Sequence, residues 1–155
     1  MAEFTISEVP DPLATWDELE PLYRGLHEHH EPLRNFKLVD GWQAGQRASL
    51  TAEGDIVVFL ARSADAPIGV LDGSIRVHPI TEVCTGYINS AYVLPEWRRQ
   101  RVTHELVDHF SRWATARGAT ELGLNVDSAN ESAVEAWRAL GFEAISLRMA
   151  RELPW

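Results

Sequence analysis

The chain has 155 residues, of which 45% are hydrophobic and 24% charged, and its formal net charge is −9. A chain of this size and balance is expected to fold as one domain, residues 1–155, with a core of its own, which excludes intrinsic disorder. The negative charge argues against a nucleic-acid partner, since such binders need a basic surface. No apolar run approaches the roughly 20 residues of a transmembrane helix, so no membrane partner is expected either.

The cysteine content and the N-terminus predict the compartment. Cys84 is the single cysteine, which excludes an intrachain disulfide framework and fits a reducing environment. The N-terminal residues lack a basic region followed by an apolar one, so no secretory signal is expected. We therefore predict a cytoplasmic protein.

The first third of the chain predicts a strand and two helices. Alternation of apolar and polar residues from Glu3 to Val9 is typical of a strand. Thr15-Trp16-Asp17-Glu18 has the spacing of a capping box, and Pro32 is expected to end the helix that follows. Asp40 can cap a second, shorter helix over Gly41 to Leu50.

Three strands are expected next, with no helix between them. They are predicted at Ile56–Ala61, Ile68–Val77 and Val83–Val93. Consecutive strands without helical crossovers form an antiparallel meander. Gly69 and Gly73 are expected to permit a bulge or a close approach of the backbone.

The pattern then changes to helix, strand, helix and strand. A helical pattern begins at Val102 and is predicted to run to Gly118. A strand is predicted at Glu121–Val126, and a second capping box at Ser128–Glu131 opens a helix ended by Gly141. Phe142–Leu153 predicts one or two final strands. The order β-α-α-β-β-β-α-β-α-β(-β) defines an α/β fold with a mixed sheet.

The stretch between the third meander strand and the next helix predicts an anion site. Pro95 ends the strand, and a short loop leads into a helix N-terminus, where unpaired N–H groups and the helix dipole favour negative charge. Arg98, Arg99 and Arg101 crowd the same end. Cations are unfavourable there unless a multiply charged anion, such as a phosphate chain, lies between them. The alternative is a solvated basic turn.

A second motif gives the chain a family resemblance. The spacing Asn-x-x-Ala-x-x-x-aromatic-x-x-x-Gly-Phe is met at Asn130, Ala133, Gly141 and Phe142. Together with Val93–Arg98 and the order of elements, it resembles the GNAT superfamily of N-acetyltransferases. The resemblance implies that two parallel strands, here Val83–Val93 and Glu121–Val126, splay apart and that acetyl-CoA lies in the resulting V.

The resemblance also implies a set of cofactor-binding residues. A bulge near Tyr92–Leu94 would free backbone groups for the pantetheine arm, and the following loop would hold the pyrophosphate. These residues are Val93, Leu94, Arg98, Arg99, Gln100, Arg101, Val102, Thr103 and Asn130. Family members use glycines where Arg101 and Thr103 stand. The Cβ of Arg101 can obstruct a phosphate or its guanidinium can bind one, and we expect CoA binding to be kept.

The catalytic residues are less well defined. Trp137 occupies the position of the family's usual tyrosine acid; an indole N–H cannot supply a proton, although Tyr92 can reach the region. Many relatives carry a carboxylate where this chain has Asn89 or Ser90. The remaining candidates for the base are Glu82, His78, Asp72, Cys84 and the cluster His27-Glu28-His29-His30-Glu31, in which His27 or His30 titrates in the useful range. No third spaced ligand set accompanies these histidines, so no metal is expected.

The sequence therefore predicts an acetyl-CoA-dependent N-acetyltransferase. Acetyl-CoA is the co-substrate, and the acceptor is a primary amine of a small molecule or a peptide, which attacks the thioester directly. The acceptor pocket is expected between the first two helices, the Ile56–Val77 hairpin and the Val83–Val93 strand. The alternative is a catalytically impaired CoA-binding sensor or interaction module. A final strand exchanged or paired between subunits is compatible with a homodimer.

Overall fold

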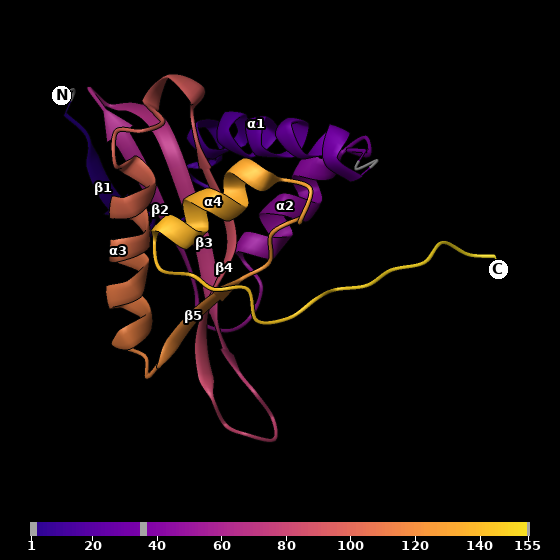
Figure 1. The fold of residues 1–155 in the computed structure, drawn as a ribbon. Helices are drawn as coiled ribbons and strands as arrows, with labels where there is room; N and C mark the ends of the chain where they lie inside the picture. The colour runs from indigo at the N-terminus through magenta and orange to yellow at the C-terminus, as the bar shows by residue number, and fades with distance from the viewer. Residues whose placement is uncertain (1–2, 35–36, 155) are drawn as a thin grey trace. The chain divides into compact units, whose positions relative to one another are not determined.

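The structure is a computed structural model that describes residues 3–34 and 37–154. Its elements are β1 (Thr5–Glu8), α1 (Trp16–Arg34), α2 (Trp42–Leu50), β2 (Ile56–Ser63), β3 (Ala66–Val77), β4 (Cys84–Val93), η1 (Pro95–Trp97), α3 (Val102–Thr115), β5 (Glu121–Leu124) and α4 (Glu131–Ala139) (Figure 1). They fall into two compact units, one that ends at Asn125 and one that begins at Val126.

The sheet of the first unit has the order β1-β2-β3-β4-β5. Neighbouring strands are antiparallel from β1 to β4, and β5 is parallel to β4, which confirms the meander and the mixed sheet. The β4–β5 ladder joins Thr85–Ile88 to Glu121–Leu124 and ends there, whereas β4 continues to Val93. The parallel pair thus separates after Ile88, as the resemblance implies.

Helices cover both faces of this sheet. The main core cluster joins Leu19, Leu22 and Tyr23 of α1 to Val58 and Val70 of the sheet. Asp72 of β3 accepts a hydrogen bond from Tyr23 and so faces α1. Adjacent residues of a strand face opposite sides of the sheet, so Gly73 faces α3. A Cβ on Gly73 would lie 2.4 Å from the Phe110 ring of α3. Glycine is therefore required for α3 to approach the sheet.

A β-bulge lies in the middle of the β3–β4 ladder. Asp72 pairs with Ser90 and Gly73 with Ile88, which leaves Asn89 as the extra residue. The bulge expected near Tyr92–Leu94 is therefore wrong. Pairing there is regular, and the Leu94 N–H donates to the Ile68 carbonyl over 2.9 Å. The bulge falls at Gly73, where a Cβ would stand 2.8 Å from the Tyr87 carbonyl oxygen, so the prediction that Gly73 permits a bulge or a close backbone approach is confirmed.

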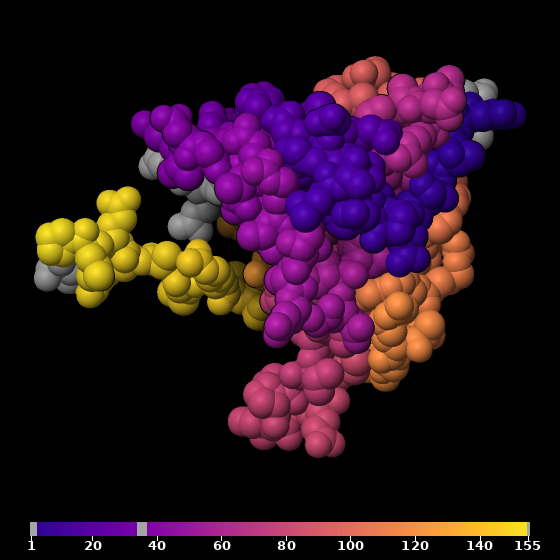
Figure 2. Space-filling view, turned by 180° about the vertical axis from the view of Figure 1, so that it is seen from behind, coloured from indigo at the N-terminus to yellow at the C-terminus, as the bar shows by residue number. Residues whose placement is uncertain are grey.

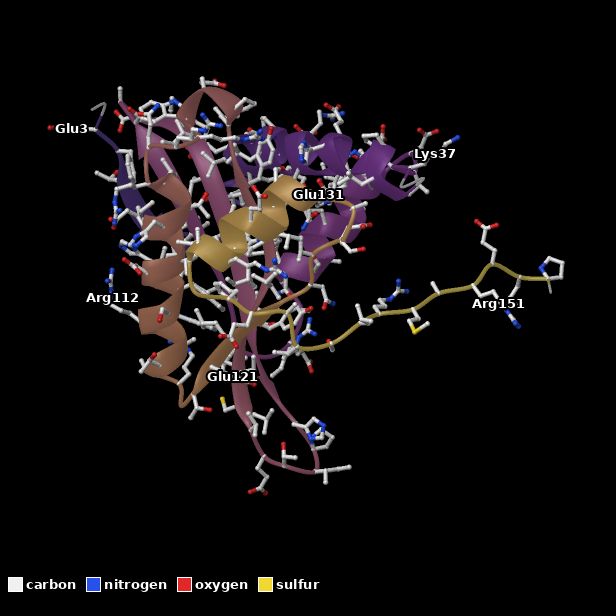
Figure 3. The ribbon with its side chains drawn as sticks, viewed as in Figure 1. Glu3, Lys37, Arg112, Glu121, Glu131 and Arg151 are labelled. Carbon is white, nitrogen blue, oxygen red and sulfur yellow. The ribbon has the colours of Figure 1, made fainter. Side chains whose placement is uncertain are left out.

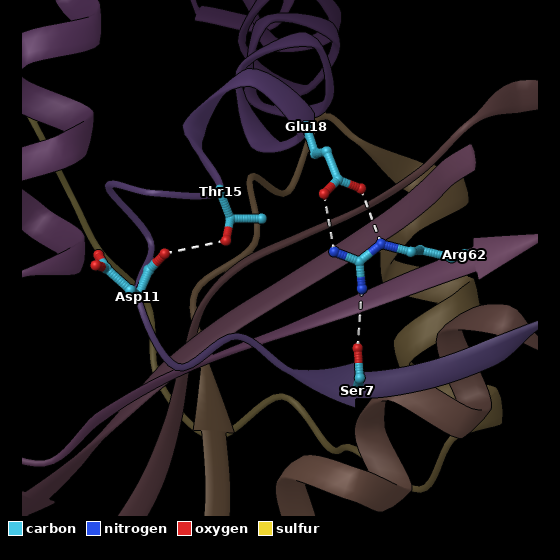
Figure 4. Close-up of polar contacts among 5 residues, drawn as sticks. All are labelled: Ser7, Asp11, Thr15, Glu18 and Arg62. Atoms are coloured by element: carbon cyan, nitrogen blue, oxygen red, sulfur yellow. Dashed lines mark hydrogen bonds and ion pairs between the residues drawn. The ribbon is translucent and has the colours of Figure 1, made fainter. Parts of the chain in front are cut away.

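The predicted capping box at the start of α1 does not form. The Thr15 hydroxyl donates to the Asp11 carbonyl oxygen over 3.0 Å, and the Glu18 carboxylate binds Arg62 through two N–H···O contacts of 2.8 and 3.0 Å (Figure 4). Arg62 also donates to the Ser7 hydroxyl at 3.1 Å. Glu18 thus ties α1 to β2 and β1 because a bidentate arginine is a stronger partner than a backbone N–H.

Two other helix boundaries differ from the prediction. Pro32 does not end α1, which continues to Arg34. A proline leaves the carbonyl four residues earlier without its helical donor, and here that residue, Glu28, is exposed so that water can take its place. Asp40 does not cap α2; Gly41 is the N-cap, with a left-handed φ of 79° and no side-chain bond.

In the second unit, Asn130 caps α4 and accepts the Ala133 N–H over 3.3 Å, so the capping box predicted from Ser128 is wrong. The strand or strands predicted at Phe142–Leu153 are also wrong for the described residues, which contain no strand after β5. Ile145, Leu147 and Met149 alternate as predicted but are 87%, 86% and 88% exposed. Alternation selects a face, but a strand forms only where a neighbour pairs with it.

Charged side chains cover the outside of the helices, and Figure 3 shows Arg112 pointing away from α3. Within residues 3–34 and 37–154, no helix is both long enough and apolar enough to cross a bilayer.

Candidate functional site

The loop between β4 and α3 has an unusual backbone. Arg101 is the N-cap of α3 with a φ of 67°, and Arg99 has a φ of 61°. Both lie in the left-handed region, which costs an L-residue roughly 1–2 kcal/mol and is ordinarily left to glycine. No side chain caps the first turn of α3. The positive end of the helix dipole therefore faces a loop whose arginines are held in strained conformations.

The side chains of this loop have two different tasks. Arg98 donates from Nε to the Val93 carbonyl over 3.2 Å, and Gln100 donates to the Glu96 carbonyl over 3.1 Å. These two residues fix the loop. Arg99 and Arg101 are exposed, so their charges face solvent at the start of the helix.

The first turn of α3 completes the loop. Val102 is buried, at 1% exposure, and anchors the turn, whereas Thr103 is half-buried. Among the described residues, one group could hold a metal ion on this turn: His104, Glu105 and Asp108, whose possible metal-binding atoms lie within 4.8 Å of one another. A guanidinium nitrogen of Arg101 lies 3.2 Å from His104, which disfavours a cation and favours an anion at this place.

The free edge of β4 lies beside the loop. The Leu94 N–H points to β3, and backbone groups alternate in direction along an antiparallel strand, so those of Ala91 and Val93 point away from β3. On that side the pairing with β5 ends at Ile88. The Val93 carbonyl oxygen already accepts a hydrogen bond from Arg98. The Val93 N–H and the Ala91 backbone are thus the groups that β4 can offer to an extended ligand, without the bulge that was predicted.

Tyr92 and His27 lie on the face that α1 covers. A Cβ on Gly25 of α1 would lie only 2.7 Å from the Tyr92 hydroxyl oxygen, so Gly25 makes room for this ring. His27 Nε2 lies 2.7 Å from the Gln46 side-chain oxygen of α2, and its ring meets Trp42 edge-on with centroids 5.1 Å apart. The structure thus places Tyr92 and His27 in the region predicted for the acceptor.

Asp72 is the base candidate that the structure places most centrally. It is 3% exposed and accepts the Tyr23 hydroxyl over 2.6 Å. Burial raises the pKa of Asp72 to about 6, although Tyr23, Ser90 and Asn89 each favour its charged form. Burial and the neighbouring carboxylate raise the pKa of Tyr23 well above its usual value. The signal in the sequence is an acidic residue inside an apolar strand.

The structure does not bring Glu82 to this region. Glu82 is exposed in the loop between β3 and β4, which projects from the unit in Figure 2. The stretch of β4 from Cys84 to Ala91 lies between Glu82 and Tyr92 and alone spans roughly 26 Å at about 3.3 Å per residue. His78, in the same loop, accepts the N–H groups of Ile80 and Thr81, each over 3.2 Å, and so holds the turn.

The second unit holds the two remaining predicted residues. Asn130 is buried, and its side-chain oxygen is used as the cap of α4. Trp137 is half-buried and meets Phe142 edge-on, with ring centroids 5.4 Å apart. These contacts explain why both residues suit α4, and their roles toward a ligand stay predictions.

Comparison with known proteins gives a consistent result. A model of the Acetyltransferase (GNAT) family matches residues 14–142. Aminoglycoside N(6')-acetyltransferase type 1 of Salmonella typhimurium is 30% identical over 89 residues, which are 55% of this chain and 61% of that relative. The chain thus matches about three-fifths of the relative's length.

Two solved structures share the fold. Aminoglycoside N-acetyltransferase AAC(6')-Iy in complex with CoA has a TM-score of 0.79 at 19% identity, covering 99% of this chain and 96% of that one. A mutant BH1408 protein from Bacillus halodurans has a TM-score of 0.84 at 17% identity, covering 97% and 99%.

Proposed function

Because the chain belongs to the GNAT family of acetyltransferases, we propose that it transfers the acetyl group of acetyl-CoA to a primary amine of a small molecule by direct attack on the thioester. The observation that carries this proposal is the loop before α3. It combines an uncapped helix start with two exposed arginines, Arg99 and Arg101, in left-handed conformations. Such strain persists where the surrounding structure holds it, and it commonly marks a ligand site.

The residues of the loop fit the pyrophosphate of CoA. Uncapped N–H groups and the helix dipole favour an anion, and the two guanidinium groups can add charge-assisted hydrogen bonds. Thr103 adds a hydroxyl on the first turn. The Val93 N–H and the Ala91 backbone would pair with the pantetheine arm. Acetyl-CoA supplies the acetyl group as a thioester, and the chain positions it.

A small polyamine is the acceptor that we propose. The Salmonella typhimurium relative is named an aminoglycoside acetyltransferase, and the structural neighbour AAC(6')-Iy carries the same description. The net charge of −9 favours the approach of a cationic substrate. Trp16, Trp42 and Tyr92 are partly buried beside the α1 core. An arginine guanidinium already lies 5.2–5.6 Å from each ring centroid, so these rings favour contact with the apolar face of a sugar over contact with an ammonium group.

The proposal is tested in two steps. Calorimetry with acetyl-CoA should show saturable binding, and the absence of a signal at millimolar concentration would overturn the cofactor assignment. Release of free CoA thiol is then followed with aminoglycosides that carry a 6'-amine, with matched aminoglycosides that carry a 6'-hydroxyl, and with peptides that have a free amino terminus. We expect turnover with the first group. Turnover with peptides alone would refute the small-molecule acceptor.

A non-catalytic CoA-binding module is the second candidate. Trp137 favours it because an indole cannot protonate a leaving thiolate. Loss of such an acid would lower the rate by about 10²-fold, the lower end of general-acid contributions, since a thiol leaves readily. Binding of acetyl-CoA with no thiol release across the whole amine panel would select this candidate over the enzyme.

A further inference from the structure

A buried carboxylate lies where β5 separates from β4. Asp72 of β3 is the one acidic side chain that is buried among the described residues. Its partner in the β3–β4 ladder is Ser90, which stands two residues beyond Ile88, the last β4 residue that pairs with β5. Asp72 therefore lies directly behind the part of β4 whose other edge pairs with no strand among the described residues.

The groups around Asp72 come from three elements. Tyr23 of α1 donates its hydroxyl over 2.6 Å, β2 presents the apolar Val58, and β4 presents Ser90 and Asn89. Tyr23 is the titratable group among them, and the contacts of Asp72 in the described chain include no arginine, lysine or histidine. A buried carboxylate without a cation is energetically costly, so packing alone does not explain an acidic residue at this position.

A purely structural role does not explain why residue 72 is an aspartate. An asparagine could accept the Tyr23 hydroxyl equally well and would tie α1 to β3 without burying a charge. A carboxylate with a pKa near 6, by contrast, can accept and release a proton close to neutral pH. Ser90 is half-buried and so connects this carboxylate with the surface of β4.

We propose that Asp72, acting through the Ser90 hydroxyl, receives the proton that the acceptor amine loses during acetyl transfer. The proposal rests on the proposed function. It makes Ser90 the residue that meets the amine and Asp72 a positioning residue behind it. The base is thereby supplied from β3, since neither Asn89 nor Ser90 on β4 can hold the proton itself.

The step balances as follows. The nitrogen lone pair forms the C–N bond, and the C–S bond breaks with its electron pair on sulfur. The nitrogen proton passes to the Ser90 oxygen while the Ser90 proton passes to Asp72. The thiolate takes a proton from water, Asp72 later returns its proton to solvent, and the products are an amide and a thiol.

Three variants test this relay. Asp72→Asn keeps an oxygen for Tyr23 but removes the proton acceptor, and Ser90→Ala breaks the relay while Asp72 stays buried. Asp65→Asn is the matched control, because it makes the same chemical change in the exposed turn between β2 and β3. Each is compared with the wild type for kcat, for the KM of the amine, for acetyl-CoA affinity by calorimetry and for the pH dependence of kcat/KM.

We expect kcat to fall about 10²-fold in both Asp72→Asn and Ser90→Ala, the size typical of a lost general base, with KM and acetyl-CoA affinity unchanged. The acid limb of the pH profile should disappear in Asp72→Asn and persist in Asp65→Asn. Either relay variant within about threefold of the wild type overturns the proposal. If circular dichroism shows that Asp72→Asn does not fold, Ser90→Ala alone decides.

A measurement without turnover separates this inference from the proposed function. In ¹³C NMR of carboxyl-labelled aspartate, Asp72 should titrate near pH 6, and Ser90→Ala should move that midpoint. An unmoved midpoint would show that Ser90 does not contact the carboxylate, which overturns the relay even if the enzyme is active. Failure of every amine in the wild type, with a moved midpoint, would instead refute the proposed function and leave the Asp72–Ser90 contact established.

Discussion

Replacement of Arg101 by glycine is the sharpest test of the loop before α3. Arg101 has a φ of 67° and an exposed side chain, so the change relieves the backbone and removes one charge. The left-handed conformation costs an L-residue roughly 1–2 kcal/mol. Glycine returns part of this gain because the unfolded chain becomes more flexible, by roughly 0.5–1 kcal/mol. We expect Arg101→Gly to raise the free energy of unfolding by up to about 1.5 kcal/mol.

The same change should weaken the binding of acetyl-CoA. A hydrogen bond to a charged group contributes about 1.5–3 kcal/mol, and the low end applies at an exposed site. Since 1.4 kcal/mol corresponds to a factor of ten in affinity, we expect Kd to rise about tenfold. Urea denaturation measures the stability, and calorimetry measures the affinity.

A second glycine variant and one control make the result interpretable. Arg99→Gly relieves a similar backbone strain, with a φ of 61°, two positions earlier in the loop. Arg112→Ala removes an exposed charge from the last turn of α3 and should leave acetyl-CoA affinity unchanged. Tighter binding by Arg101→Gly would refute the reasoning, because it would mean that the arginine obstructs the phosphate site.

Three further tests probe the helix contacts, the second unit and the buried acid. Gly25→Ala should destabilise the fold by about 1–3 kcal/mol, because the new Cβ would lie 2.7 Å from the Tyr92 hydroxyl oxygen. Gly45→Ala in α2 meets no atom within 4 Å and should stabilise the fold by up to about 1 kcal/mol. Urea denaturation measures both changes. Equal effects of the two would contradict the packing described for Tyr92. Trp137→Tyr should keep or raise turnover in the thiol-release assay, and a severe loss with the fold intact would reveal a specific role of the indole. The pKa of Asp72 is raised from 3.8 to about 6, so between these pH values the folded protein holds a proton that the unfolded chain releases. The free energy of unfolding of the wild type should therefore fall by about 3 kcal/mol as the pH rises from about 4 to about 6. Asp72→Asn should remove this loss when unfolding is followed between pH 4 and 7, and an unchanged slope would assign it to another group.

Much of the fold is predictable from residues that act locally. The meander follows from strand-forming runs with no helical segment between them, and the separation of β4 and β5 follows from the family motif. Helix starts were less predictable. Thr15 and Ser128 stand at capping-box spacing, but Glu18 has a stronger partner in Arg62, and Asn130 caps α4 in place of Ser128. Spacing identifies a capping residue only when no distant group competes for the same side chain.

Contacts between distant segments account for the rest. Gly25 suggests a weak point in α1 when the helix is considered alone, yet it is the position where the helix makes room for Tyr92, 67 residues later in the chain. Gly73 indicates a bulge or a close backbone approach in the sequence, but its partner in that approach, the Tyr87 carbonyl, lies on another strand and is known only from the structure. The alternating tail around Leu147 is the reverse case, a local pattern without the partner that a strand requires.

The site itself shows why a comparison of motifs found one half and missed the other. The loop around Arg101 differs from the family at positions where glycine was expected, and the structure keeps the glycine-like backbone there with an arginine side chain. Asp72 matches no motif and was one of several base candidates in the sequence; the role proposed for it depends on its position opposite Ser90 in the β3–β4 ladder. Both residues oppose local preference, one by its backbone and one by its buried charge. Stability alone would favour glycine at 101 and a neutral residue at 72. The strained backbone of Arg101 and the buried carboxylate of Asp72 lie near the two ends of the same stretch of chain, from Ser90 to the start of α3. We therefore attribute both unfavourable features to one ligand that binds along this stretch.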